Sequence, residues 1–213
     1  MLRPLGTKRF RRSLTVASDD QLIASVRAGR SEEFAELTAR YREQVARLCQ
    51  RFVADREIAR DLAQESFIRA FTGLSSYRTE MPFSGWLRAI VVNVCYDELR
   101  RRQRRPEQLV GDFLDLECAW VQLVTQATPE QIVDAAEQQQ AAQVLAQNLL
   151  DSLRPDDRTV MILKETEDCS IHEIAEMLGW SEAKVKIRAF RARQSMRRQA
   201  ERILAAQRRR LQR

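Results

Sequence analysis

Hydrophobic residues recur at steps of three and four along most of the chain, the spacing of one buried face of an α-helix. The longest such run is Phe34, Leu37, Tyr41, Val45, Leu48 and Phe52. Similar runs occupy 58–71, 86–94, 160–163, 171–178 and 185–196. Strand-like alternation is nearly absent, and 6 Gly and 5 Pro are few for hairpin turns. The pattern predicts an all-α protein.

Polar residues at the ends of these runs predict where helices begin and stop. Ser18-Asp-Asp-Gln21 and Ser170-Ile-His-Glu173 read as capping boxes, in which two side chains satisfy free amides at a helix start. Asp55 and Ser181 are expected to cap two further helices. Gly179 is expected to end the helix before it, because glycine tolerates a left-handed conformation.

The predicted helices fall into two small domains, each with its own apolar residues, joined by a flexible linker. Residues 18–105 hold four helices, and residues 129–206 end in two helices separated by a short turn. Residues 106–128 form an acidic connector between the domains. Residues 1–17 and 207–213 are expected to be basic tails.

Charge is strongly segregated along the chain, although the formal net charge is only +6. Residues 86–105 carry 6 basic and 2 acidic groups, and residues 177–213 carry 12 basic against 2 acidic. Residues 106–176 between them carry 15 acidic and 3 basic groups. Two separate basic stretches indicate two contacts with a polyanion, for which nucleic acid is the natural choice. The alternative is a pair of solvated helix faces.

Several function classes find no support in the residues. The four cysteines are Cys49, Cys95, Cys118 and Cys169. They form no C-x-x-C pair and His172 is the only histidine, so we expect free thiols, no metal site and no cofactor. A single histidine also disfavours most acid–base and nucleophilic catalysis, so we expect no enzyme. Without a long apolar segment or signal sequence, we expect a cytoplasmic chain with no membrane insertion.

The last two helices have the pattern of a helix-turn-helix. The final helix is expected to face inward with Val185, Ala189, Ala192 and Met196. Its other faces are basic, with Lys184, Lys186, Arg188, Arg191, Arg193, Arg197 and Arg198. A short-linked helix pair whose second helix is basic outside an apolar stripe is typical of a DNA major-groove reader.

At this point the chain resembles sigma-70-type RNA polymerase sigma factors of the compact extracytoplasmic function group. Residues 55–71 are similar to the segment that binds the polymerase clamp, and 83–102 to the segment that melts and reads the −10 element. Residues 174–179 with 184–193 resemble the −35 reader. The resemblance spans about 18–205 and implies sigma region 2 followed by sigma region 4. It also implies three partners: core polymerase (β′ clamp and β flap), promoter DNA and an anti-sigma factor.

The resemblance, together with the chemistry of the side chains, nominates site residues. For core polymerase these are Asp61, Gln64 and Glu65. For −10 binding and melting they are Tyr77, Phe83, Arg88, Asn93, Asp97, Arg100 and Arg101. For −35 binding they are Ser181, Lys184, Lys186, Arg188, Arg191 and Arg197.

Within the last set we expect a division of roles. Arg188 and Arg191 lie three apart, on neighbouring positions of a helix, and are expected to read bases. Arg197 lies further along and is expected to hold phosphate. The chain departs from the family pattern at Lys184, where threonine is usual, and at Ile187, where serine is common, so its −35 preference should be its own.

Three other functions stay open on sequence. A conventional repressor or activator would explain 156–200 but leave 55–102 without a role. A DNA-cutting recombinase with a helix-turn-helix tail would need a catalytic domain for which no strand pattern exists. The third is a helical adaptor.

Overall fold

The computed structural model describes residues 17–104 and 145–211, which form helices and turns without a strand, as predicted. The first range contains α1 (Asp19–Arg27), α2 (Phe34–Phe52), α3 (Arg56–Gly73) and α4 (Phe83–Gln103), with 3-10 turns at Ser31–Glu33 and Leu74–Ser76. The second contains helical residues 145–151, α7 (Pro155–Met161), a π-helical turn (Ile162–Thr166), α8 (Ile171–Leu178) and α9 (Glu182–Leu211). The acidic connector, nearly all of the N-terminal tail and residues 129–144 of the predicted second domain lie outside the described residues.

The predicted helix caps form at the residues that the sequence indicates. Both capping boxes form, at Ser18 before α1 and at Ser170 before α8. The Asp55 carboxylate accepts from two amides at the start of α3, and the Ser181 hydroxyl accepts from an amide in the first turn of α9. Gly179 ends α8 with φ 63°. The C-terminal boundary differs, because α9 continues to Leu211 through residues expected to be a tail.

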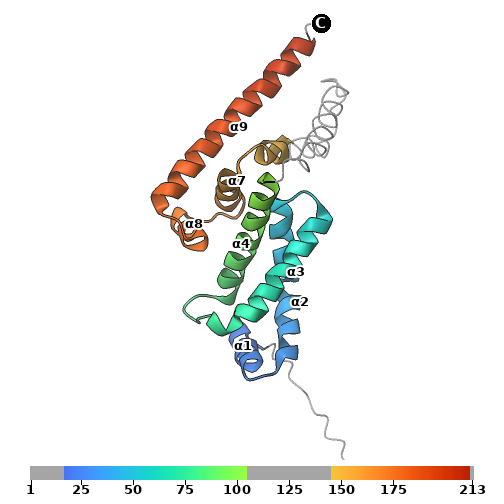
Figure 1. Ribbon diagram of the computed structural model, residues 1–213, viewed down its shortest axis with the longest axis vertical. Helices are drawn as coiled ribbons and strands as arrows, with labels where there is room; N and C mark the ends of the chain where they lie inside the picture. Colours follow the sequence, from blue (N-terminus) through green and yellow to red (C-terminus); the bar gives the residue numbers. More distant parts are fainter. Residues whose placement is uncertain (1–16, 105–144, 212–213) are drawn as a thin grey trace, which may run out of the picture.

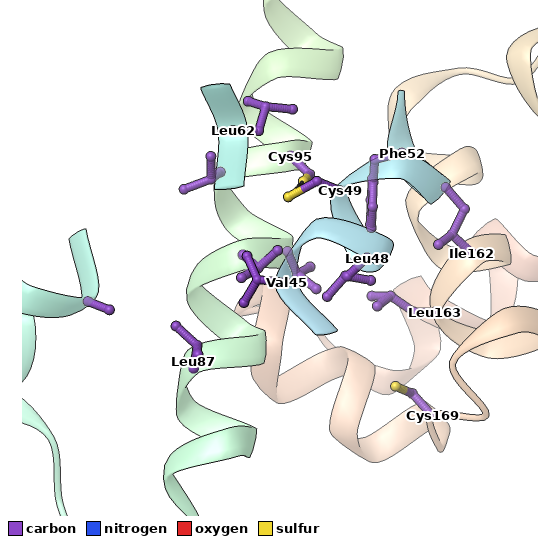
Figure 2. Packing of buried hydrophobic residues seen from close by; sticks show 14 of the residues in the cluster. Val45, Leu48, Cys49, Phe52, Leu62, Leu87, Cys95, Ile162, Leu163 and Cys169 are labelled. Atoms are coloured by element: carbon purple, nitrogen blue, oxygen red, sulfur yellow. Dashed lines mark hydrogen bonds between the residues drawn. The ribbon is translucent and has the colours of Figure 1, made fainter. Parts of the chain in front are cut away.

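The first four helices enclose a core in which α2, α3 and α4 pack on one another. Cys49 and Cys95 lie in the middle of it with their sulfur atoms 3.8 Å apart, and neither thiol is exposed (Figure 2). The hydrogen bond with Cys49, together with burial, raises the pKa of the Cys95 thiol. Cys49, Cys95 and Cys169 are buried free thiols, as predicted, while Cys118 lies outside the described residues.

In this arrangement the apolar residues of the two predicted domains meet in one shared core. Ile162 and Leu163, both fully buried, lie beside Leu48 and Phe52 of α2 (Figure 2). Helices α7 and α8 pack along α4, while α9 projects away from the body (Figure 1). The packing brings the acidic α7–α8 segment onto the α4 face that carries predicted −10 residues.

In the described ranges, no helix is long and apolar enough to cross a membrane. The same residues contain no cluster of three or more His, Cys, Asp or Glu side chains that could hold a metal ion.

Candidate nucleic-acid interface

Two predicted −10 residues of α4 make contacts with the C-terminal half. The Arg88 guanidinium lies 3.8 Å from a carboxylate oxygen of Glu167 and donates to Cys169 Sγ at 3.5 Å. The Asn93 amide donates to the Met177 carbonyl at 3.0 Å. Both side chains are half-buried. A DNA strand would have to displace these contacts to reach either group.

Glu167 holds two arginines of the first domain at once. Besides Arg88, it pairs with Arg51 of α2, which also donates to the Thr166 carbonyl at 2.8 Å. The Glu167 side chain is only 14% exposed. Its carboxylate occupies two guanidinium groups that would otherwise be free to bind an anion.

Tyr96 forms a further contact between α4 and the C-terminal half. Its hydroxyl donates to Asp156 at 2.8 Å, and its ring meets the Trp180 ring edge to face at 5.8 Å between centroids. Burial, followed by the hydrogen bond to Asp156, raises the pKa of Tyr96 to about 12. The hydroxyl is therefore held in its protonated, donating form.

Tyr77 and Phe83, which the sequence nominates for −10 binding and melting, lie in the core of the first domain in this arrangement. Each is 3% exposed, and their rings pack edge to face at 5.8 Å. The Tyr77 hydroxyl donates to the Met81 carbonyl at 2.8 Å, which closes the loop before α4. Both residues still line the wall of a cavity of about 460 Å³, together with Asp19, Asp20, Thr79, Glu80, Met81 and Pro82.

The arginine cluster at the end of α4 is more accessible. Arg100 is exposed and lies over the Tyr96 ring at 5.6 Å. Arg101 is 62% exposed and pairs with Glu98 at 2.7 Å. Burial of Glu98 acts to raise its pKa, but hydrogen bonds from Arg101 and Arg102 outweigh it and the pKa is lowered. Asp97 is exposed and lies 3.5 Å from Arg69 of α3.

The helix-turn-helix forms from α8 and α9, and its inward stripe is the predicted one. Val185, Ala189 and Ala192 are at most 3% exposed, and Met196 is partly buried beside Ala192. The first turn of α9 follows Gly179 and is therefore set at an angle to α8 (Figure 1). The face of α9 opposite this stripe carries exposed side chains, among them Lys186, Ile187 and Arg191.

The six predicted −35 residues divide into four that are exposed and two that are engaged. Ser181, Lys186, Arg191 and Arg197 are exposed. Lys184 lies over the Trp180 ring at 3.5 Å. Arg188 pairs with Asp156 at 2.8 Å and with Asp157 at 3.4 Å. In this arrangement Arg188 therefore turns toward α7, while Arg191 stays exposed.

The predicted polymerase-binding residues lie on an exposed face of α3. Asp61 and Gln64 are exposed, and Glu65 is 45% exposed and pairs with Arg69 at 2.7 Å. Ile68, one turn further along, is 51% exposed, and Phe71, almost another turn beyond it, is 43% exposed. An apolar patch beside carboxylates on one helix face is a surface suited to protein docking.

Sequence reasoning missed the residues that join the halves. Arg51, Glu167, Tyr96, Asp156 and Trp180 carry no local signal, because each contacts a partner at least 60 positions away. Only the placement of a large aromatic directly after Gly179 hinted that Trp180 has a packing role.

Comparisons with known proteins agree with this geometry. The family description "Sigma-70 region 2" matches residues 37–105, and "Sigma-70, region 4" matches residues 143–196. The chain is 32% identical to ECF RNA polymerase sigma factor SigW of Bacillus subtilis, covering 83% of this chain and 94% of the relative. It is 30% identical to RNA polymerase sigma-H factor of Pseudomonas aeruginosa, covering 86% and 94%.

Two solved structures share the fold. CnrH in complex with the cytosolic domain of CnrY has a TM-score of 0.54 and 23% identity, covering 84% of this chain and 95% of that one. The sigma factor RpoE in complex with the anti-sigma factor NepR, from Bartonella quintana, has a TM-score of 0.52 and 18% identity, covering 80% and 98%. With both regions present in order and with relatives matched over most of their length, this chain belongs to the extracytoplasmic function group of sigma-70 family RNA polymerase sigma factors.

Proposed function

We propose that this chain binds core RNA polymerase and directs transcription initiation at promoters that carry matched −10 and −35 elements. The observation that carries the proposal is the presence, in one chain, of an exposed docking face on α3 and a basic recognition helix, α9. A repressor needs only the second feature. A polymerase subunit that reads promoters needs both.

Core polymerase would bind α3 through its β′ clamp. Asp61, Gln64 and Glu65 offer acceptors to a basic partner surface, and Ile68 and Phe71 offer apolar area beside them. The β flap would bind the C-terminal domain.

Promoter DNA would meet the chain at two places. Lys186 and Arg191 on α9 face outward for the −35 major groove, where arginine can grip guanine O6 and N7 together. Arg88, Asn93, Asp97, Arg100 and Arg101 would serve the −10 strand. The cavity beside Tyr77 and Phe83 has carboxylates at its edge, which suit the amino groups of an extruded base.

Simultaneous reading of both elements requires the halves to separate. Elements centred about 25 base pairs apart lie about 85 Å apart on a duplex. Asn93 of α4 and Met177 of α8 are in hydrogen-bond contact at 3.0 Å. The arrangement described here is thus a closed state, and we infer that the free chain binds promoter DNA poorly until polymerase opens it.

We further propose that an anti-sigma factor controls the chain. A protein that binds the closed state better than the open one would keep Arg88 and Arg188 engaged with Glu167, Asp156 and Asp157. Such a partner needs no contact with DNA-reading groups to silence them.

Reconstituted transcription tests the proposal. Core polymerase, the full chain and a library of promoter DNA should yield transcripts from templates that share −10 and −35 sequences, and polymerase without the chain should not select them. Tight, specific binding by the free chain without polymerase association would favour the repressor. Nicking of supercoiled plasmid by the chain alone would favour the recombinase.

A further inference from the structure

The recognition helix carries two exposed apolar side chains that the proposed basic contacts do not use. Ile187 is 52% exposed and Phe190 is 62% exposed. Large apolar side chains with this much exposure are few among the described residues, and the others lie on α3 and in the loop before α4. Two of them on one helix, three positions apart, form a small apolar face.

Ile187 points away from the helix-turn-helix core. Successive residues of an α-helix are turned by about 100°, so Ile187 lies about 200° from Val185, which is fully buried. Arg188, the next residue, is turned toward α7 by Asp156 and Asp157. Ile187 therefore occupies the centre of the outer face, in the second turn of α9, where a recognition helix contacts base edges.

The surroundings of Ile187 favour DNA over an apolar protein as the partner. Lys186 is 64% exposed beside it, and Arg191 is exposed one turn further along. These cations would anchor on phosphates or guanine while an apolar group is pressed into the groove between them. The principal apolar group that the major groove offers is the C5 methyl of thymine.

We propose that Ile187 contacts the C5 methyl group of a thymine in the −35 element and is a specificity-determining residue for that base pair. The proposal rests on the −35 role proposed above for α9. A β-branched side chain suits this task because it holds its methyl groups in one rotamer. It also offers cytosine no acceptor for its N4 amino group, so thymine is favoured over cytosine at the same place.

Replacing thymine by deoxyuracil tests the contact, because only the C5 methyl is removed. Holoenzyme made from core polymerase and the full chain is bound to selected promoters in which each −35 thymine, on either strand, is replaced in turn. We expect one position where deoxyuracil weakens binding about fourfold, the loss that corresponds to exposing one methyl group. In Ile187→Ala this ratio should fall to about one, and Ile187→Val should keep most of it.

Gln194→Ala is the matched control, because Gln194 is exposed on the same helix two turns further along. It should leave the thymine-to-deoxyuracil ratio unchanged. The inference is overturned if no thymine is sensitive, or if Ile187→Ala weakens all templates alike while the ratio stays at fourfold; the second outcome would make this face a protein-docking surface. Each result presupposes promoter-selective initiation, so failure of the proposed function appears separately as loss of that selection.

Discussion

The two halves of the molecule differ in how far they expose the residues proposed to contact DNA. In the first domain, Arg88 and Asn93 contact the C-terminal half, and Tyr77 is buried in the domain's own core. In the helix-turn-helix, Lys186 and Arg191 are exposed. The closed state therefore covers more of the side chains proposed for the −10 strand than of those proposed for the −35 duplex. Of the residues proposed for the −10 strand, Arg100 and Arg101 at the end of α4 also stay exposed, so the covered part of the first domain is the stretch of α4 around Arg88 and Asn93.

The halves also differ in how they hold charge. Pairs within α2, such as Glu43 with Arg47, are well exposed and add little to stability. The C-terminal half instead contains Asp151 and Arg158, whose side chains are 18% and 10% exposed and whose charged atoms lie 2.5 Å apart. Burial lowers the pKa of Arg158, with Asp151 acting in the opposite direction. The first half also buries a carboxylate, Glu98, which is 8% exposed, but its partners Arg101 and Arg102 are 62% and 24% exposed. In the Asp151–Arg158 pair, by contrast, both partners are largely buried.

The largest expected effect comes from breaking that buried pair. Asp151→Ala leaves the Arg158 guanidinium buried without its carboxylate, which should lower the free energy of unfolding by about 3–5 kcal/mol. Urea unfolding followed by circular dichroism measures it. Glu43→Ala, the surface control, should change stability by less than about 0.5 kcal/mol. Equal losses of unfolding free energy in Asp151→Ala and Glu43→Ala would contradict the contrast between a buried and an exposed ion pair.

Next in size is the loss of base reading by α9. Arg191→Ala should cost about 1–3 kcal/mol in holoenzyme binding and relax preference at one −35 base pair, because an exposed arginine can grip one guanine. Arg197→Ala, which removes a side chain 82% exposed, should weaken all sequences alike and reduce the salt slope by about one. Promoter-library selection measures the loss of preference at one base pair, and salt-dependent binding measures the uniform weakening. Unchanged preference in Arg191→Ala would contradict the assignment.

A smaller effect is expected from opening the closed state. Glu167→Gln removes the charge that holds Arg51 and Arg88, which should cost the closed state about 1–2 kcal/mol. Binding of the free chain to a single-stranded −10 oligonucleotide should rise about 5- to 30-fold, as the open fraction grows. Glu165→Gln, whose partner Arg193 lies in the same half, is the control and should leave that binding unchanged. Equal affinities in both variants would argue against occlusion.

The smallest expected effect concerns Tyr96. Tyr96→Phe removes the hydrogen bond to Asp156 and should cost about 1 kcal/mol. The pKa of Tyr96 is near 10 in the unfolded chain and is raised to about 12 in the folded one. The contribution of its hydroxyl to the free energy of unfolding is therefore complete below about pH 10 and is lost as the pH rises from about 10 to about 12. Unfolding measured across this range should show the loss in the parent chain and a smaller one in the variant. Parallel curves would contradict the role of this hydroxyl.

Much of the fold was predictable because its signals are local. A capping box needs residues three apart, as at Ser18 and Gln21, and a left-handed helix end needs only Gly179. The inward stripe of α9 follows from helical periodicity alone. The family resemblance rests on such short segments, which is why it was visible in the chain.

Which of the candidate site residues are exposed and which are engaged by other residues could not be predicted in the same way. Helical spacing places Arg188 and Arg191 on adjacent positions, but only the approach of α7 turns Arg188 toward Asp156. Likewise, nothing near Tyr77 in sequence indicates that its ring closes against Phe83 rather than facing a base.

The amino-acid sequence by itself determined the helices, their caps, the basic recognition helix and the order of the two regions, because each depends on residues within a few turns of one another. Only the tertiary structure decided which charged groups are free. Glu167 contacts Arg51, which lies 116 positions away in the sequence, and Tyr96 contacts Asp156, which lies 60 positions away. Such contacts exist only once Ile162 and Leu163 pack against α2, because burial of that shared core is what brings the charges together.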